Sequence, residues 1–268
     1  MRMGNPLENQ IELPEDWLAE GPATTASPSA GSKPQPKLPK RERTRAGLIA
    51  AARRVFARLG YLNTKITDIT HEAGVANGLF YSYFTDKKDL LRALTDEFKS
   101  QLPHVVSAKW KRRPHPLVGI AVGVEMFARD YLRHQADIAG IFQAAIVDRT
   151  FAELWQETRS HGMRLASGYF RDAQKLGFAK DVDPELAASA ICSMIEFSCY
   201  NWNSLKLDFP KRVVTEQELI LTLVTLVLSC FGHGRECPDA DEYLKILRTR
   251  LRSAGARRKG GRAPGARR

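Results

Sequence analysis

Cysteine and long apolar runs are scarce in this chain, and each shortage excludes a class of protein. The four cysteines are Cys192, Cys199, Cys230 and Cys237. They form no CxxC pair, so we expect neither a zinc site nor a disulfide framework, but reduced and partly buried thiols. The most apolar stretch, LILTLVTLVLSCF at 219–231, is shorter than the roughly 20 residues that cross a bilayer. The N-terminus lacks the apolar run of a secretory signal, so the sequence predicts a cytoplasmic protein with no membrane partner.

Enzyme signatures are also missing from the sequence. The six histidines follow neither HExxH nor any Cys/His ligand spacing, and no GxSxG, Walker or GxGxxG pattern occurs. We therefore expect no catalytic activity, no cofactor and no metal ion. His71 is expected to be a surface group rather than a ligand.

Positive charge is what the sequence has in excess, and it is concentrated in two blocks. The net charge is +11; ten Lys and Arg between Lys33 and Lys65 face the single acid Glu42, and ten more follow Glu242 without any acid. Residues 1–32 lean the other way, with five acids against one arginine. The two positive blocks indicate a polyanion partner, although charge runs are also common on solvated surfaces.

Composition divides the chain into a folded body and two flanking segments. Residues 1–40 are rich in Pro, Ser, Ala and Gly and are predicted to be a disordered arm, and residues 253–268 a basic disordered tail, because neither can bury enough apolar surface. Between them, apolar residues recur at helical spacing, as in Leu48, Ala52, Val55, Phe56 and Leu59. No strand-period segment of useful length competes. The sequence predicts an all-α fold.

Residues 67–84, TDITHEAGVANGLFYSYF, have the pattern of a helix-turn-helix. A short first helix is followed by a turn at Gly74 and by a second helix that starts near Ala76 or Asn77. In such a unit the second helix enters the major groove of DNA. The spacing alone leaves open a helical hairpin that serves only packing.

Four aromatic residues in this segment are divided between two faces of the second helix. Phe80 and Phe84 are four residues apart and share one side, so we expect them to anchor the helix to the core. Tyr81 and Tyr83 then remain free for DNA phosphates or bases.

From Ile49 to Leu91 the sequence resembles the DNA-binding domain of the TetR family of bacterial transcriptional regulators. The matching positions, in unbroken register, are Gly60-Tyr61, Thr64, Asp68-Ile69, Ala73-Gly74-Val75, Gly78, Tyr81, Phe84, Lys87 and Leu90. The resemblance implies a three-helix DNA-binding head, residues 41–86. It also implies a helical effector-binding and dimerisation domain, residues 87–252, to which a fourth helix joins the head.

The resemblance also assigns DNA contacts position by position. Phosphate contacts fall on Thr64 or Lys65, Tyr81, Tyr83 and Lys87. Base contacts fall on Asn77, Gly78, Leu79 and Ser82. Lys87 at a helix N-terminus attracts phosphate, and Gly78 lets the backbone approach DNA closely. Leu79 stands where the family commonly has Thr; it can contact a thymine methyl but cannot donate a hydrogen bond, so we expect an unusual operator sequence.

Beyond Leu91 the resemblance is one of pattern. LGFAKDVDPELAASAI at 176–191 echoes a family junction in which an Asp-Pro cap opens a dimer-forming helix, and Asp183, Pro184 and Glu185 form a strong helix start. This helix and the next, 216–231, are expected to form a four-helix bundle with a second subunit, giving a homodimer.

The resemblance further implies a small apolar effector that releases the protein from a double-stranded DNA operator. Residues that could line its cavity are Phe127, Tyr131, Phe142, Trp155, Met163, Tyr169, Phe170, Met194, Phe197, Tyr200 and Trp202. Aromatic and Met side chains on helices are also the ordinary material of a core.

Three hypotheses follow from the sequence. The first is a nucleoid-associated transcriptional regulator, a repressor released from a palindromic operator. The alternative is a nonspecific DNA-coating protein without an effector, whose affinity depends on salt but hardly on DNA sequence. The third is a redox sensor acting through Cys192 and Cys199, although a helix separates them by roughly 10 Å along its axis, too far for a direct disulfide.

Overall fold

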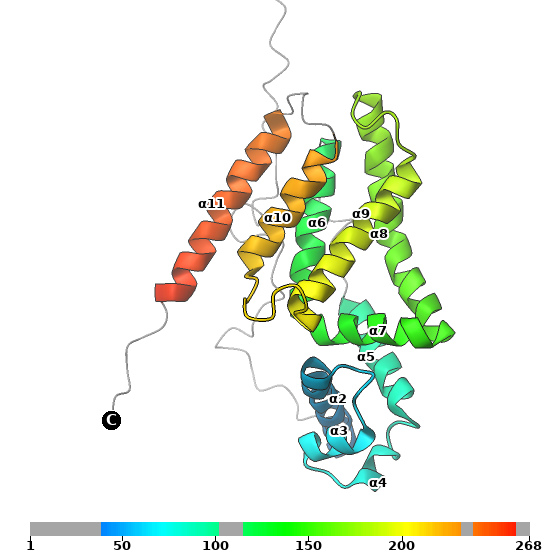
Figure 1. The fold of residues 1–268 in the computed structure, drawn as a ribbon. Coiled ribbons are helices and arrows are strands. Elements are labelled where there is room, and N and C mark those ends of the chain that lie inside the picture. The colour runs from blue at the N-terminus through cyan, green and yellow to red at the C-terminus, as the bar shows by residue number, and fades with distance from the viewer. Residues whose placement is uncertain (1–38, 102–114, 232–237, 261–268) are drawn as a thin grey trace, which may run out of the picture.

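The computed structural model describes residues 39–101, 115–231 and 238–260, which are helical with connecting turns and contain no strand. The all-α prediction is confirmed. Figure 1 shows a small head at one end and a longer helical body above it. The head and its connecting helix comprise α2 (Lys40–Leu59), α3 (Ile66–Ala73), α4 (Asn77–Phe80) and α5 (Lys87–Gln101).

The body is a bundle of long helices that stands on a transverse one. Its elements are α6 (Pro116–Arg133), α7 (Gln135–Val147), α8 (Arg149–Lys175), α9 (Pro184–Cys199), the π-helical turn η2 (Tyr200–Leu205), α10 (Glu216–Ser229) and α11 (Pro238–Gly260). In Figure 1, α7 lies across the lower end of the bundle and faces the head. The predicted start of α9 is confirmed, because the Asp183 carboxylate accepts hydrogen bonds from the amides of Glu185 and Leu186 at 2.9 and 2.8 Å.

The core of the head forms where α2 covers the helix-turn-helix. The predicted inner face of α2 is buried at Leu48, Ala52, Val55 and Phe56, but Leu59 is 39% exposed, since it lies in the last turn beyond the packed part of the helix. Burial of this apolar stripe, rather than helix propensity, stabilises a helix of this kind.

The body is built around α6, which lies between α8, α10 and α11 (Figure 1). The buried acid of α6 is Glu125, whose carboxylate accepts hydrogen bonds from the hydroxyl of Tyr243 at 2.5 Å, from Nε of Arg129 at 3.0 Å and from the guanidinium of Arg250. A buried charge is stable only when it is paired and hydrogen-bonded. These bonds therefore attach α11 to α6.

The ends of the chain differ in part from the prediction. Helix α11 continues to Gly260. The prediction of disorder was therefore wrong for residues 253–260, because the helix continues beyond Leu251, its last large apolar residue. The predicted arm, residues 1–40, lies outside the described residues except for Pro39 and Lys40, as do residues 261–268 of the tail. None of the helices in the described ranges combines the length and apolar character needed to cross a membrane.

Candidate nucleic-acid interface

The turn of the helix-turn-helix forms where it was predicted. Gly74 has a φ of 67°, in the left-handed region that a residue without Cβ adopts at no steric cost. Its amide donates to the carbonyl of His71 at 3.1 Å, and the amide of Val75 donates to that of Thr70 at 3.0 Å. These bonds satisfy carbonyls at the end of α3 and direct the chain into α4.

Ala76, the N-cap of α4, has no side chain that can accept a hydrogen bond, and two side-chain contacts fix the starts of α3 and α4 instead. The Asp68 carboxylate accepts from the Lys65 amide at 2.8 Å and fixes the start of α3. The Thr70 hydroxyl donates to the side-chain oxygen of Asn77, the first residue of α4. With its oxygen engaged, the amide nitrogen of Asn77 remains the group that can donate outward.

The predicted division of the aromatic residues is confirmed. Phe80 and Phe84 are buried with ring centroids 5.6 Å apart, whereas Tyr81 is 60% exposed and Tyr83 is half-buried. The four positions predicted to contact bases are all exposed: Asn77, Gly78, Leu79 and Ser82. The buried pair thus leaves Asn77, Gly78, Leu79 and Ser82 on the surface, and we call these four residues the exposed strip.

Thr64 is a correction to the predicted phosphate contacts. Its side chain is only 2% exposed, and its hydroxyl donates to the carbonyl of Gly60 at 2.7 Å. Lys65, the other candidate at this place, is exposed. A hydroxyl enclosed by its own loop cannot reach a phosphate, so Lys65 is the remaining candidate.

Lys87 is a second correction. Its ammonium donates to the carbonyl oxygens of Tyr61 at 2.7 Å, Leu62 at 3.3 Å and Thr64 at 2.7 Å, and it lies 4.4 Å from the centroid of the Tyr61 ring. Burial at this place lowers the pKa of the ammonium. Since an ammonium has three hydrogens and three carbonyls use them, Lys87 ties α5 to the loop 60–64 instead of pointing at solvent.

Apart from Lys87 and the exposed Arg92 of α5, the cations of the head fall into two sets. The paired set comprises Arg53 with Asp137 and Glu97, Arg54 and Arg58 with Glu72, and Lys88 with Asp148. The second set is exposed, and no carboxylate in the described part of the chain forms an ion pair with it. We call this set the free cations: Lys40, Arg41, Arg43, Arg45 and Lys65. The positive field of the head therefore comes from the start of α2 and the start of α3.

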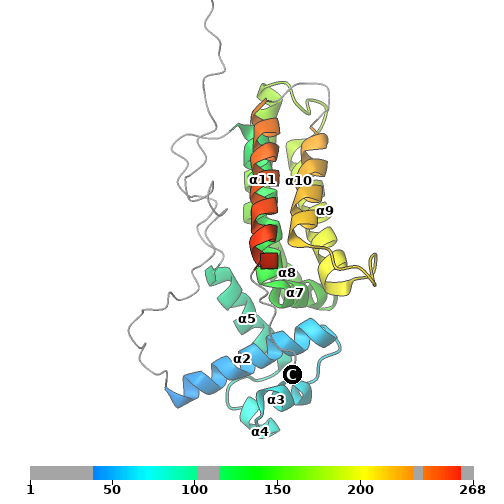
Figure 2. The ribbon, with the colours of Figure 1, turned by 90° about the vertical axis from the view of Figure 1, so that its left-hand side faces the viewer.

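The free cations of α2 lie beside the helix-turn-helix. The guanidinium carbon of Arg45 is 5.3 Å from the centroid of the Phe84 ring, directly after the exposed strip of α4. Figure 2 shows the first turns of α2 projecting at the same lower end of the molecule as α3 and α4. Exposed cations near an exposed reading segment are the electrostatic footprint of a nucleic-acid interface.

The head is joined to the body by Arg53, a contact that sequence reasoning missed. Arg53 of α2 donates from Nε to both carboxylate oxygens of Asp137 in α7 at 3.0 Å, and from Nη2 to Glu97 in α5 at 3.1 Å. Asp137 is 1% exposed, and burial raises the pKa of its carboxyl. The sequence does contain a sign of this contact. The apolar helix ADIAGIFQAAIV holds a single acid, and a buried acid requires a partner.

Two further contacts hold the same junction. The ammonium of Lys88, at the start of α5, lies 2.5 Å from the carboxylate of Asp148, the cap of α8. The side-chain oxygen of Gln143 in α7 accepts from the Leu62 amide at 3.3 Å. A movement of α7 would therefore reach both α2 and the loop that Lys87 fixes.

The residues predicted to bind an effector do not all converge. Phe142 of α7, Trp155 of α8 and Phe197 of α9 come together with Tyr200 of η2: the Phe142 ring centroid lies 5.4 Å from that of Trp155, 6.5 Å from that of Phe197 and 4.9 Å from that of Tyr200. We call these four the aromatic cluster. It joins the transverse helix α7 to the two helices that follow it.

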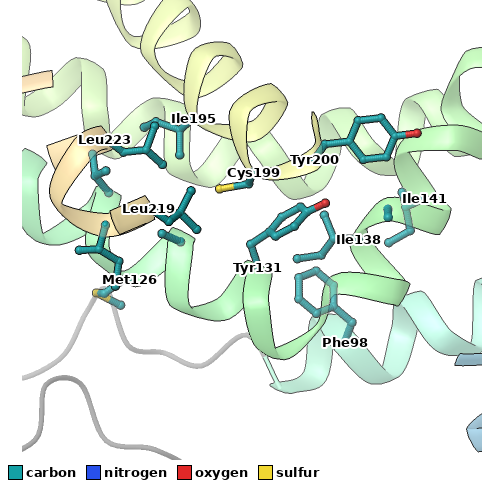
Figure 3. Packing of buried hydrophobic residues seen from close by; sticks show 14 of the residues in the cluster. Phe98, Met126, Tyr131, Ile138, Ile141, Ile195, Cys199, Tyr200, Leu219 and Leu223 are labelled. Atoms are coloured by element: carbon teal, nitrogen blue, oxygen red, sulfur yellow. The ribbon is translucent and has the colours of Figure 1, made fainter. Parts of the chain in front are cut away.

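The other candidates lie elsewhere in the body. Tyr131 is 1% exposed and its hydroxyl lies 2.6 Å from that of Ser204; Figure 3 shows it packed among Phe98, Ile138 and Cys199. Phe127 lies beside it, with ring centroids 6.3 Å apart. The remaining candidates are separate from one another. Phe170 stacks on Phe231, Trp202 packs against Phe209, and Tyr169 lies directly over Gly119. Met163 and Met194 are half-buried.

A buried acid lies next to the aromatic cluster. Glu196 of α9 is 8% exposed, and Arg159 of α8 donates to it from Nε at 2.9 Å. Burial raises the pKa of this carboxyl to about 7. Burial also raises the pKa of Cys192 to about 11 and that of Cys199 to about 12. Because the thiolate is the reactive form, these thiols do not support the redox-sensor hypothesis.

Comparison with known proteins was made by sequence and by fold. The sequence profile described as "Bacterial regulatory proteins, tetR family" matches residues 48–94. The chain is 28% identical over 173 residues to the HTH-type transcriptional repressor BepR of Brucella suis biovar 1 (strain 1330). The alignment covers 59% of this chain and 80% of BepR. The chain is also 29% identical over 188 residues to the Fatty acid metabolism regulator protein of Bacillus subtilis (strain 168), covering 65% and 92%.

A solved structure agrees with this chain in fold over most of its length. The TetR-like transcriptional regulator from Rhodococcus sp. RHA1 superposes with a TM-score of 0.55 at 18% identity, covering 71% of this chain and 96% of the other. At this identity the likeness is one of fold: a head with a helix-turn-helix followed by a helical body.

Proposed function

Because the chain belongs to the TetR family of bacterial transcriptional regulators, we propose that it is a homodimeric repressor that a small apolar effector releases from a palindromic operator. The observation that carries the DNA-binding part is the placement of the free cations beside the exposed strip of α4. Its place of action would be the cytoplasm, on the nucleoid.

The reading of the operator is assigned to the exposed strip. Gly78 lets the backbone approach the groove closely, and the amide of Asn77 and the hydroxyl of Ser82 offer hydrogen bonds to base edges. Leu79 supplies an apolar contact for a thymine methyl. Lys65 and the two tyrosine hydroxyls of Tyr81 and Tyr83 hold the phosphates, which position the head without specifying sequence.

The dimer is assigned to the outer faces of α9 and α10. Leu186 of α9 is 73% exposed and Leu226 of α10 is 48% exposed. Large apolar side chains on neighbouring helices mark an interaction surface, and a two-fold axis would pair each helix with its copy. The two heads would then face half-sites about one DNA turn apart, roughly 34 Å.

The effector response is assigned to the aromatic cluster and to α7. An apolar ligand that separates Phe142 from Trp155 would move α7, which carries Asp137 and Gln143, and with it the head. Changing the population of the DNA-binding form from 99:1 to 1:99 requires a preference of about 5.5 kcal/mol. Burial of several apolar groups of a ligand is of that size.

The test of DNA recognition is recovery of genomic fragments bound by the purified protein, followed by fluorescence titration of the recovered palindrome and a scrambled duplex. We expect the palindrome to bind at least a thousandfold more tightly at physiological salt. Leu79→Ala should reduce this discrimination and leave the scrambled duplex unaffected. Equal binding of both duplexes would favour the alternative, a nonspecific DNA-coating protein.

The test of the effector is a screen of fatty acyl, steroid and aromatic compounds for release of operator DNA. Fatty acyl compounds come first because of the Bacillus subtilis relative, a fatty acid metabolism regulator by name. Trp155→Ala should weaken the response to any active compound, whereas Phe127→Ala, outside the aromatic cluster, should leave it intact. If both variants respond like the unmodified protein, the aromatic cluster is not the effector site.

A further inference from the structure

The N-terminal residues of this chain carry a charge opposite to that of the head. Five carboxylates lie between positions 8 and 20, and Arg2 is the only cation before Lys33. We call residues 8–20 the acidic segment: Glu8, Glu12, Glu15, Asp16 and Glu20 are its acids. Carboxylates form charge-assisted hydrogen bonds with Lys and Arg, the same side chains that contact the phosphates of DNA.

The head has positive charges that no acid in the described part of the chain neutralises. The cations that face the body are paired with carboxylates, as Arg53 is with Asp137. The free cations, by contrast, are exposed at the starts of α2 and α3, and no ion pair joins them to an acid within the described ranges. The only sequence between the acidic segment and the first free cation is a linker, residues 21–39.

The linker is long enough to bring the two together. Nineteen residues separate Glu20 from Lys40, and at about 3.4 Å per residue a chain of that length can span at most roughly 65 Å. Helix α2, with 20 residues, is about 30 Å long. The acidic segment can therefore reach the start of α2, the start of α3 and the exposed strip of α4 in its own subunit.

We propose that the acidic segment docks on the free cations when DNA is absent and is displaced when operator phosphates occupy the same cations. This inference rests on the proposed function, because the DNA-binding face is the surface that the segment covers. Each contact is exposed and screened by salt, so the docking is weak and reversible. The tether supplies an effective concentration in the millimolar range, which makes weak contacts count.

Competition of this kind has a defined signature. Free DNA must displace the segment, so the apparent affinity for every duplex is lowered by the same factor, about three- to tenfold at low salt for a millimolar effective concentration. Because the free cations already have an anionic partner, fewer counterions are released on DNA binding, and the salt dependence is shallower. Discrimination between operator and scrambled DNA is unchanged.

The first experiment neutralises the segment without changing the length of the chain. The variant combines Glu8→Gln, Glu12→Gln, Glu15→Gln, Asp16→Asn and Glu20→Gln. The control neutralises the same number of exposed acids on the body: Glu153→Gln, Asp181→Asn, Glu185→Gln, Asp241→Asn and Glu242→Gln. We expect the first variant to bind both operator and scrambled DNA about three- to tenfold more tightly at low salt, with a steeper salt slope. An equal gain in the control would mean that only net charge matters and would overturn the docking.

The second experiment needs no DNA and so separates this inference from the proposed function. Lysine acetylation by a soluble succinimidyl ester, read by mass spectrometry, compares the free cations Lys40 and Lys65 with the exposed reference lysines Lys180 and Lys206. In the full chain at low salt we expect slower acetylation of Lys40 and Lys65, with recovery after neutralisation of the segment. Unchanged rates at both lysines overturn the inference, even if the protein binds its operator. Protection without any DNA binding would retain the docking and refute the repressor.

Discussion

Arg53 and Asp137 join the DNA-binding head to the body, with Nε of the guanidinium 3.0 Å from both oxygens of the carboxylate. The pair spans α2 and α7, and the acid is almost completely buried. An effector that moves α7 therefore acts directly on the helix that forms the back of the head.

The first prediction concerns the stability of this junction. Arg53→Ala leaves Asp137 buried without its partner and should lower the free energy of unfolding by about 3–5 kcal/mol. Arg54→Ala, next along the same helix but exposed in its pair with Glu72, should cost about 0–1 kcal/mol. Urea denaturation measures both. The double variant Arg53→Met with Asp137→Leu should regain most of the stability, and continued loss there would show that the pair is not the cause.

The second prediction separates Lys65 from Lys87. Lys65→Ala should reduce the slope of log affinity against log salt by about 0.9 for each lost phosphate contact, hence by about two for a dimer. Lys87→Ala should leave that slope unchanged. It should instead lower the free energy of unfolding by about 1–3 kcal/mol, because three carbonyls lose their donor. DNA titrations at several salt concentrations and urea denaturation measure the difference. A shallower slope with unaltered stability in Lys87→Ala would return that lysine to the phosphate contacts.

The third prediction concerns the dimer. Leu186→Glu and Leu226→Glu each place two like charges across a two-fold interface and should give monomers in sedimentation velocity, with loss of cooperative operator binding. Ile146→Glu, at an apolar position in α7 that is 72% exposed, should remain dimeric. A dimer in all three variants would move the interface away from the outer faces of α9 and α10.

The fourth prediction concerns pH. The carboxyl of Glu196 has a pKa raised by burial from 4.5 to about 7. Its contribution to stability is complete below the unfolded value and is lost as the pH rises through about 7, since the unfolded chain then releases the proton more readily. At about 1.4 kcal/mol per pKa unit, the loss is about 3 kcal/mol. The difference in stability between Glu196→Gln and the unmodified protein should therefore shift in favour of the variant when the pH is raised from 5 to 8. Melting temperatures against pH measure this, with the exposed Glu153→Gln as control; superimposable profiles would rule out Glu196 as the titrating group.

Sequence reasoning succeeded where local spacing decides the structure. The positions of Phe80 and Phe84 predicted which face of α4 is buried, because residues four apart must share a side. Asp183 and Pro184 predicted the start of α9, because the Asp side chain accepts from the free amides of a first helical turn and Pro needs no N–H donor there. Both inferences need only the neighbouring residues.

It failed where a distant segment supplies the partner. Lys87 looked free because nothing in its own helix reveals that the carbonyls of the loop 60–64 fold back over it. Thr64 looked exposed for the same reason. Aromatic residues of the body gave candidates but no location, since Phe142, Trp155 and Tyr131 follow the same helical spacing whether they meet one another or not. Isolated acids in apolar helices, such as Asp137 and Glu196, were the stronger signal.

The contacts of Glu125 can be completed only late in the synthesis of the chain. Its partners Tyr243 and Arg250 are 118 and 125 positions further along. At roughly 5–20 residues per second, a ribosome needs about 6–25 s to add them. During that interval α6 holds a carboxylate with Arg129 as its early partner, in the place where the core will close. The docking of α11 is thus the step that completes the body, and a chain cut before Tyr243 would leave the α11 side of α6 uncovered and Glu125 without Tyr243 and Arg250.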